Sequence, residues 1–420
     1  YDFMTDTRLK ELAEYGFDDV EISQLRNALF EIAKQTLEHY DEICEEDLRS
    51  LGQLTELRHE LRKHSPLAET NVMKLYSYID ELLDSIKDHG TPQFTRQARC
   101  AFMARSFCRT LVEKGYFTKQ EMDDFMLSIP TVASEFERDF DLYSHGKLSR
   151  DDFNHLYGHL RLGTYDIRSD SYRNIYFDVA SANLTGNNKV KQEAKSLDLE
   201  RLQVALDEAG IPVTPEKFIE FIKKATQNRE YFKFEFTKSL SLMLDVIVKL
   251  GEVMAIARED MSYLEIQDLL SYHSRDSYIQ TIETRRRFYH VNSYLVLPEV
   301  IFDVGDIDVI DIDEARPNFI TNKVVEAPIV NLDEDHDSDI TGKIVALTKA
   351  DPGYDWIFAK DIAGFVTKYG GAASHMAIRC AEFGIPAAIG CGEKIYQRIH
   401  RMQIMCLDCE NGRITEKQSQ

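Results

Sequence analysis

One histidine near the end of the chain stands where a helix is expected to begin. It closes the run Gly370-Gly371-Ala372-Ala373-Ser374-His375. The glycine pair allows a tight turn and a close approach of the backbone to a ligand, and Ser374 suits the N-cap of a helix that starts at His375. Free amide groups and the positive end of the helix dipole favour an anion there. The motif therefore predicts a histidine that carries a phosphoryl group.

Several neighbours of this histidine have side chains that suit a phosphate. A neutral imidazole nitrogen is a competent nucleophile near pH 7, and its other nitrogen needs a partner, for which Ser374, Thr367 or a backbone carbonyl are the candidates. The predicted phosphate-binding residues are Thr367, Gly370, Gly371, Ser374 and Arg379, the last one helical turn after His375. The alternative is a capped surface helix whose histidine has no chemical role.

A second group of charged residues lies on a predicted helix in the middle of the chain. Arg229 and Lys233 are four residues apart, so their cationic ends converge on one face, and Glu230 is adjacent. Two cations beside a carboxylate suit the transfer of a phosphoryl group and a nearby proton transfer. An ordinary surface ion-pair ladder is the alternative.

The elements that must position these residues are mainly helical at first and contain strands later. Helical spacing of apolar residues covers about residues 9–128 and 214–257, and a shorter helix is predicted over 264–272. The polar, glycine-containing residues 138–175 are predicted as loop. Residues 294–298 and 309–312 are β-rich, and strands are predicted at 342–347, 362–367, 387–389 and 403–408, with a hairpin turn at Asn411-Gly412.

This pattern predicts a multidomain protein. A mainly α-helical region is followed by a small α/β domain in which strands alternate with short helices. The predicted parts are a helical segment at 1–90, a mainly helical domain at 91–290, a linker with β-rich runs at 291–340, and the α/β domain at 341–420.

Composition excludes several classes of function. The formal net charge of −22 argues against sequence-independent binding of nucleic acid, which needs Lys and Arg to displace counterions. No apolar run approaches the ~20 residues of a membrane span, so no membrane partner is expected. The first residues show no signal-peptide pattern, and the seven cysteines are expected to be reduced thiols of a cytoplasmic protein.

No metal site is predicted from the sequence. The pair Cys406-x-x-Cys409 has no second pair of ligands at metal-site spacing nearby. The acidic run at 331–339 is interpreted as a solvated connector.

Residues 342–390 resemble the swivelling phosphohistidine domain of the phosphoenolpyruvate-utilising enzymes. The shared pattern is a strand, GG-x-x-SH-x-A, a helix, and Gly384-Ile385-Pro386-Ala387 before the next strand. The resemblance implies that His375 is the phosphorylated residue. One departure concerns the arginine that many members carry six residues after the histidine: that position is Ala381 here, and Arg379 stands two residues earlier. Which cation meets the phosphate is therefore open.

The central part resembles the substrate domain of the rifampin-phosphotransferase type within this family. The resemblance implies that Arg229, Glu230 and Lys233 act with His375 in catalysis at the acceptor site. A loop with Gly-His followed by an arginine and an aspartate is also similar to a family loop. It implies an acceptor pocket shaped by His159, Arg161, Thr164 and Asp166, and a purely structural loop tie is the alternative.

The family makes its phosphohistidine with an ATP-grasp domain, which this sequence lacks. The chain begins without methionine, so we expect the C-terminal part of a longer dikinase-type phosphotransferase, inactive without that domain in cis. ATP and Mg²⁺ are expected to bind the missing domain and none to bind this chain alone, with AMP and phosphate as products. No (β/α) barrel follows Gln420, so pyruvate is not the expected acceptor.

The acceptor is expected to be a small molecule. Residues 155–167 resemble a subgroup found with capsule polysaccharide pathways that includes an L-glutamine kinase, so the amide of L-glutamine is the acceptor we expect. An antibiotic phosphotransferase of the rifampin type is one alternative. A non-catalytic phosphocarrier or regulatory module is the other.

Overall fold

A computed structural model describes residues 1–161, 163–174, 196–292, 301–307, 317–333, 338–372 and 374–417. The chain divides into two compact units. The first comprises Tyr1–His64, Glu81–Glu135 and Gly186–Leu240, and the second comprises Ser65–Asp80, Phe136–Thr185 and Ser241–Gln420. Three helices contribute to both units, namely α3 (Val72–His89), α6 (Val132–Ser144) and α9 (Pro215–Val253).

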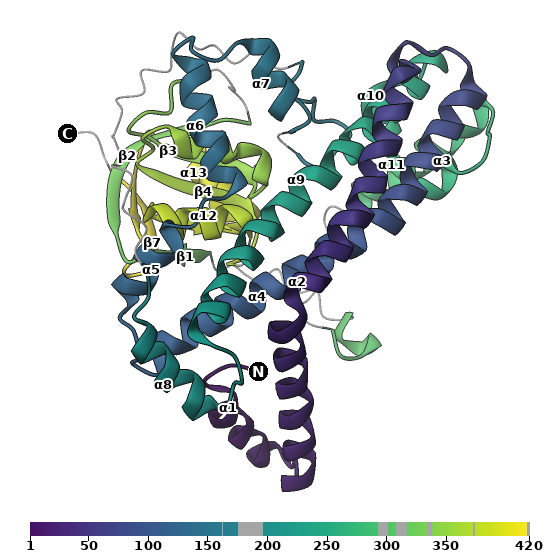
Figure 1. The fold of residues 1–420 in the computed structure, drawn as a ribbon. Coiled ribbons are helices and arrows are strands. Elements are labelled where there is room, and N and C mark those ends of the chain that lie inside the picture. The colour runs from purple at the N-terminus through teal and green to yellow at the C-terminus, as the bar shows by residue number, and fades with distance from the viewer. Residues whose placement is uncertain are drawn as a thin grey trace. The chain divides into compact units, whose positions relative to one another are not determined.

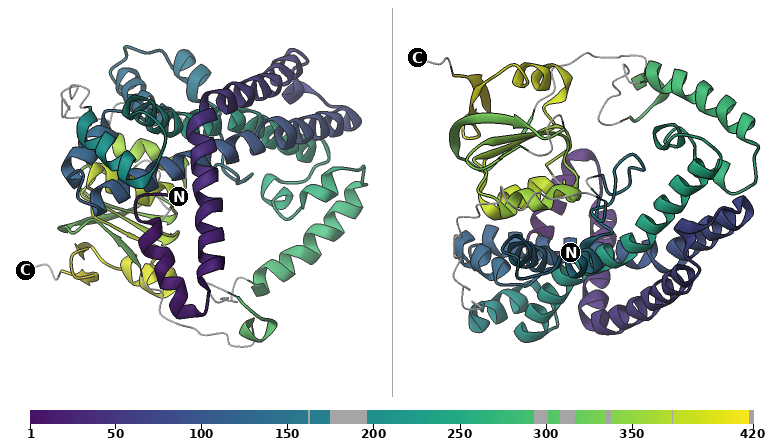
Figure 2. Two further views of the ribbon diagram at one scale, coloured as in Figure 1. Left: turned by 60° about the horizontal axis from the view of Figure 1, so that its bottom comes forward. Right: turned by 90° about the horizontal axis from the view of Figure 1, so that it is seen from above.

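The described part of the first unit is helical. Its remaining helices are α1 (Thr5–Glu11), η1 (Leu12–Tyr15), α2 (Asp19–Lys63), α4 (Thr91–Glu113), α5 (Lys119–Leu127) and α8 (Leu199–Ala209). Helix α2, the long purple helix in Figure 2, begins with a capping box between Asp18 and Glu21. A second capping box, between Thr118 and Glu121, is present at the start of α5. The helical prediction for residues 9–128 is therefore confirmed.

A buried polar chain inside the first unit fixes part of α9. The amide of Asn228 donates to the Tyr40 hydroxyl at 3.0 Å, and that hydroxyl donates to Gln97 at 2.8 Å. The Gln97 amide in turn donates to Asp47 at 2.7 Å. Because buried polar groups are costly unless paired, these bonds set the rotation of α9 at the residue just before Arg229.

The second unit carries the other short helices. They are η2 (Pro66–Ala68), α7 (Arg150–Tyr157), α10 (Arg258–Met261), η4 (Ile266–Leu269), α11 (Arg275–Asn292), η5 (Val304–Ile307), η6 (Pro352–Ala359), α12 (His375–Phe383) and α13 (Gly392–Ile399). The predicted helix over 264–272 is only the single turn η4. The β-rich runs predicted at 294–298 and 309–312 lie outside the described residues.

The loop prediction for residues 138–175 is wrong over its first half, where α6 and α7 form. Aromatic side chains at helical spacing explain the difference. Phe136 and Phe140 stack with ring centroids 5.9 Å apart, and Tyr157 meets Phe136 edge-on at 5.0 Å. Burial of these rings stabilises both helices despite the many polar residues between them.

The second unit also contains a seven-stranded sheet with strand order β1-β5-β4-β3-β2-β6-β7. The strands are β1 (Asn318–Ile320), β2 (Val324–Asn331), β3 (Ile344–Lys349), β4 (Gly364–Tyr369), β5 (Ala387–Ile389), β6 (Ile404–Asp408) and β7 (Arg413–Glu416). Neighbours from β2 to β5 are parallel, and the outer pairs β1–β5, β2–β6 and β6–β7 are antiparallel. Figure 1 shows α12 and α13 beside these strands.

The four strands predicted between residues 342 and 408 are confirmed as β3 to β6. The predicted turn at Asn411-Gly412 joins β6 to β7. Strands β1 and β2, which the sequence pattern placed in a linker, pair with β5 and with β3 and β6. The whole is a mainly helical chain whose C-terminal portion contains a small strand-containing domain.

Two glycines bring the ends of β4 and β5 into direct backbone contact. Gly390 has φ +75°, and a Cβ atom there would lie 2.3 Å from the Gly370 carbonyl oxygen. Gly370 itself has φ +137°. This close approach sets where the chain leaves β4 on its way to His375.

We predict that Gly390→Ala destabilises the second unit by about 2 kcal/mol or more, because the methyl group adds backbone strain and a clash. Thermal unfolding followed by circular dichroism should show a fall in midpoint. Gly371→Ala is the matched control, since a Cβ there meets no atom within 4 Å. Equal midpoints for the two variants would contradict the prediction.

Candidate functional site

His375 is the first residue of α12 and follows β4 after a short turn. The Ser374 hydroxyl accepts a hydrogen bond from the Ala377 amide at 3.4 Å, so Ser374 is the N-cap that the sequence predicts. The Ser374 amide donates to the Gly371 carbonyl at 2.9 Å, which closes the turn. The imidazole therefore sits at a helix N-terminus, where first-turn amides favour an anion.

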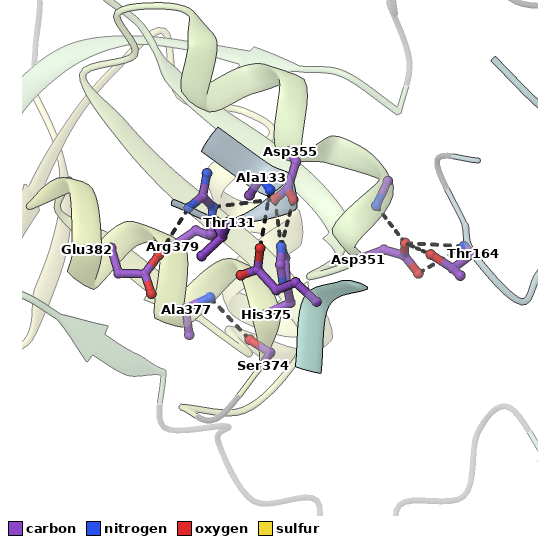
Figure 3. Close-up of polar contacts among 12 residues, drawn as sticks. Thr131, Ala133, Thr164, Asp351, Asp355, Ser374, His375, Ala377, Arg379 and Glu382 are labelled. Carbon is purple, nitrogen blue, oxygen red and sulfur yellow. Dashed lines mark hydrogen bonds and ion pairs between the residues drawn. The ribbon is translucent and has the colours of Figure 1, made fainter. Parts of the chain in front are cut away.

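The ring of His375 is held by a carboxylate that the sequence reasoning missed. Its Nε2 lies 2.7 and 2.8 Å from the two carboxylate oxygens of Asp355, as Figure 3 shows. A carboxylate only accepts hydrogen bonds, so Nε2 carries a proton in this arrangement. Both side chains are 20% exposed. The ring is thus oriented by protein and still reached by solvent.

Arg379, the predicted phosphate cation, is already engaged by carboxylates. Its side chain is buried, forms an ion pair with Glu137, and lies 3.1 Å from a Glu382 oxygen. Its Nε is 3.8 Å from Asp355, and its guanidinium lies over the Phe383 ring at 4.6 Å. Arg379 therefore links α12 to α6 and sits close to the partner of His375.

The predicted residues Thr367, Gly370 and Gly371 belong to the backbone framework under His375. Thr367 is fully buried, and its hydroxyl accepts a bond from the Gly390 amide at 3.1 Å. Gly370 packs against β5, whereas Gly371 faces open space. Of the three, Gly371 leaves the most room for a ligand beside the turn.

Helix η6 joins the partner of His375 to the predicted acceptor loop. Asp351 caps this helix, with one carboxylate oxygen accepting from the Gly353 amide at 2.9 Å and from the Thr164 hydroxyl at 3.1 Å. The Tyr172 hydroxyl donates to the Gly353 carbonyl. Burial and the nearby Asp355 carboxylate raise the pKa of Tyr172 well above its usual value, so it stays a donor. Thr164 is thereby fixed to the N-cap of the helix that carries Asp355.

His159 and Arg161 lie in the interior. The Arg161 side chain is 1% exposed, forms an ion pair with Asp245, and donates to the Ser241 hydroxyl at 3.1 Å. Burial raises the pKa of Asp245, and Arg161 opposes that rise. His159 is 7% exposed. The geometry of Arg161 therefore ties the loop to α9.

Asp166 stays at the surface of the same loop. Its carboxylate lies 2.7 Å from Arg168 and 3.4 Å from Lys349 at the end of β3. It lines a cavity of about 470 Å³ in the second unit. Hydrogen bonds from Arg168 lower the pKa of Asp166 to about 2 despite its partial burial.

The other three predicted catalytic residues lie in the first unit, on α9. The Glu230 carboxylate accepts from the Ala133 amide at 3.2 Å, at the first turn of α6. The Arg229 guanidinium lies over the Phe102 ring at 5.5 Å. Arg229, Glu230 and Lys233 are all half-buried. They share one stretch of helix, as their spacing predicts.

Comparison with known proteins adds family information to this geometry. Residues 340–412 match the mobile domain of the PEP-utilising enzymes, a segment that contains both Asp355 and His375. A rifampicin phosphotransferase of Bacillus subtilis (strain 168) is 27% identical over 222 residues, which is 48% of this chain and 24% of that protein. The match thus spans about a quarter of the relative's length.

The described residues lack two further kinds of feature. None of their helices combines the length and the apolar character needed to cross a membrane. Nor do they contain a group of three or more His, Cys, Asp or Glu side chains arranged to hold a metal ion.

We predict that Asp166 makes the free energy of unfolding depend on pH in the acidic range. Its folded pKa of about 2 lies below the ordinary value near 3.9. The stabilisation is therefore present above about pH 4 and is lost as the pH falls towards 2. Arg168→Met should flatten this part of the curve, measured as urea midpoints between pH 2 and 5. The exposed change Lys394→Met is the control of equal charge, and identical curves for all three proteins would refute the assignment.

Proposed function

We propose that the chain is the phosphohistidine-carrying part of a phosphotransferase and that His375 is the carrier. The pairing of His375 with Asp355 at the start of α12 is the observation that carries the proposal. The match of residues 340–412 to a mobile domain of PEP-utilising enzymes supports it. The relative named rifampicin phosphotransferase supports a phosphotransferase or kinase type of enzyme.

The two transfers each exchange one bond. In the first, a donor P–O bond breaks and an N–P bond to the imidazole forms. In the second, that N–P bond breaks and the phosphoryl group joins the acceptor. Before attack the ring carries one proton, on Nε2 beside Asp355, and the acceptor loses a proton when it takes the phosphoryl group. Attack by Nδ1 preserves this contact, whereas attack by Nε2 requires the ring to leave Asp355 first.

Charge around the site bears on the same step. Asp355 stabilises the positive charge that develops on the ring when it attacks phosphorus. The same carboxylate repels the arriving phosphate oxygens. First-turn amides of α12 and the guanidinium of Arg379 provide the opposing attraction, although Glu137 and Glu382 already share that guanidinium. A phosphoryl group would therefore compete with these acids for Arg379.

The donor we propose is ATP, bound with Mg²⁺ by an ATP-grasp domain in cis. Dikinase chemistry would release AMP and phosphate: the ring would displace AMP at the β-phosphorus of ATP, and water would then cleave the outer P–O bond, which releases phosphate and leaves one phosphoryl group on the ring. In this proposal His375, at the start of α12, accepts the phosphoryl group. No ATP or Mg²⁺ site is proposed within this chain alone. The proposal implies that the protein works in the cytoplasm, where ATP is present.

The acceptor we propose meets Arg229, Glu230 and Lys233, with the phosphoryl group stabilised by the two cations. The amide of L-glutamine is the first candidate, on the resemblance of residues 155–167 to proteins of capsule biosynthesis. A rifamycin is the second candidate, favoured by the name of the matched relative. Incubating the complete enzyme with L-glutamine or with a rifamycin, and measuring AMP release with each, distinguishes the two candidates.

Loss of the histidine should abolish the reaction. In a complete enzyme with its ATP-grasp domain, His375→Asn should reduce ATP-dependent AMP formation to the background rate, because no ring nitrogen remains to accept phosphorus. His64→Asn, at an exposed position of the first unit, is the matched control. Normal turnover in the His375 variant would overturn the proposed function.

Asp355→Asn should slow the phosphorylation of His375 by about 100-fold, because an amide neither balances ring charge nor holds the proton on Nε2 as a carboxylate does. Single-turnover labelling measures the rate, and phosphorus NMR reports whether Nδ1 or Nε2 is modified. Asp361→Asn is the matched control, since Asp361 is an exposed residue two positions after the end of η6. An unchanged rate would show that Asp355 does not position the ring.

A further inference from the structure

A cavity of about 470 Å³ lies in the second unit, apart from the His375 ring. Its walls come from the loop at 163–168, the last part of α9, the α10–η4 segment and the end of α11, together with Lys349 and Asp351. This volume is within the usual range for small-molecule sites. Asp166, one of the residues predicted to shape an acceptor pocket, lines this cavity, whereas the phosphotransfer proposed above places the acceptor at Arg229, Glu230 and Lys233.

The buried apolar side chains that line the cavity are called its floor. Met243, Leu244 and Ile247 line it from α9, and Met261 and Leu269 line it from the next two turns. The lining also includes Tyr263 and the exposed residues Tyr165 and Tyr289, and the rings of Tyr263 and Tyr289 meet edge-on at 5.9 Å. An apolar or aromatic body of a ligand would gain free energy by covering these surfaces.

The charged side chains that line the cavity, which we call its rim, carry both signs. Arg168 and Lys349 share the single carboxylate of Asp166, at 2.7 and 3.4 Å, so this group of three keeps one positive charge in excess.

Asp351 provides the opposite charge on the same rim. Its donors are the Thr164 amide and hydroxyl and the Gly353 amide, none of them charged. Within the described residues, no Lys or Arg nitrogen lies at ion-pair distance from Asp351. The Asp351 carboxylate also raises the pKa of the neighbouring Tyr165, after burial as the larger cause. The rim thus offers one positive and one negative pole above an apolar floor.

We propose that this cavity binds a small zwitterion with an apolar or aromatic body. The ligand's carboxylate meets Arg168 and Lys349, its ammonium group meets Asp351, and its body covers the tyrosines and methionines. Charge-assisted hydrogen bonds are the stronger kind, so each pole adds selectivity as well as affinity. The binding does not depend on phosphotransfer, and its failure would leave the role of His375 untouched.

Three matched probes test the charge pattern by calorimetric titration of the full chain. L-Phenylalanine carries both charged groups, 2-phenylethylamine lacks the carboxylate, and 3-phenylpropanoate lacks the ammonium group. We expect L-phenylalanine to bind about tenfold tighter than either relative, since each removes one charge-assisted contact.

Variants assign the two poles. Asp351→Asn should weaken L-phenylalanine about tenfold and leave 3-phenylpropanoate unchanged. Lys349→Met should weaken L-phenylalanine and leave 2-phenylethylamine unchanged. Ile247→Trp should fill the floor and abolish binding of all three. The exposed changes Lys394→Met and Glu410→Gln, away from the cavity, serve as charge-matched controls.

Asp351→Asn also removes the N-cap of η6. If this variant unfolds, Lys349→Met, at an exposed position, and Ile247→Trp still test the proposal. No binding of L-phenylalanine at millimolar concentration would overturn the proposal. So would equal binding of the three probes, or binding that persists in the Ile247 variant.

Discussion

Two carboxylates, one at the N-cap of η6 and one within it, carry the arrangement on which the candidate site depends. Asp355 fixes the ring of His375, and Asp351 fixes the loop that contains Thr164. Because η6 is only eight residues long, both contacts act on the same short segment of backbone. A shift of this turn would move the histidine partner and the loop together. The Tyr172 hydroxyl on the Gly353 carbonyl adds a third restraint at the same point.

The parts of this site that follow local rules could be predicted from the sequence. Ser374 as N-cap, His375 at the helix start and the strands on either side depend on neighbours within a few residues. Asp355 could not be found in this way, because its pairing with His375 joins residues twenty positions apart on separate elements. The run Asp351-Pro352-Gly353 was the one available signal, since it marks a capped turn before an acidic residue.

Residue type predicted ligand-binding residues less well where the side chain already makes hydrogen bonds or ion pairs within the protein. Arg161 has the charge expected of an acceptor pocket, yet it is buried against Ser241 and Asp245. Thr367 has the hydroxyl expected beside a phosphate, yet that hydroxyl binds the Gly390 amide. A sequence shows which groups are able to bind a ligand. Only the packing shows which of them the chain has already satisfied, as with the aromatic rings that turned a polar stretch into α6 and α7.

The contact of His375 with Asp355 also affects how readily the ring can be phosphorylated. A phosphoryl group on Nε2 cannot coexist with the bond to Asp355, and one on Nδ1 brings negative charge towards the same carboxylate. If His375 is phosphorylated as proposed, the modified and free rings must differ in their affinity for Asp355. Linkage then requires that the difference between the free energies of this contact in the free and the modified ring changes the phosphorylation equilibrium by the same amount. To the extent that phosphorylation weakens the contact, the interaction that orients the ring for attack also favours release of the phosphoryl group to an acceptor.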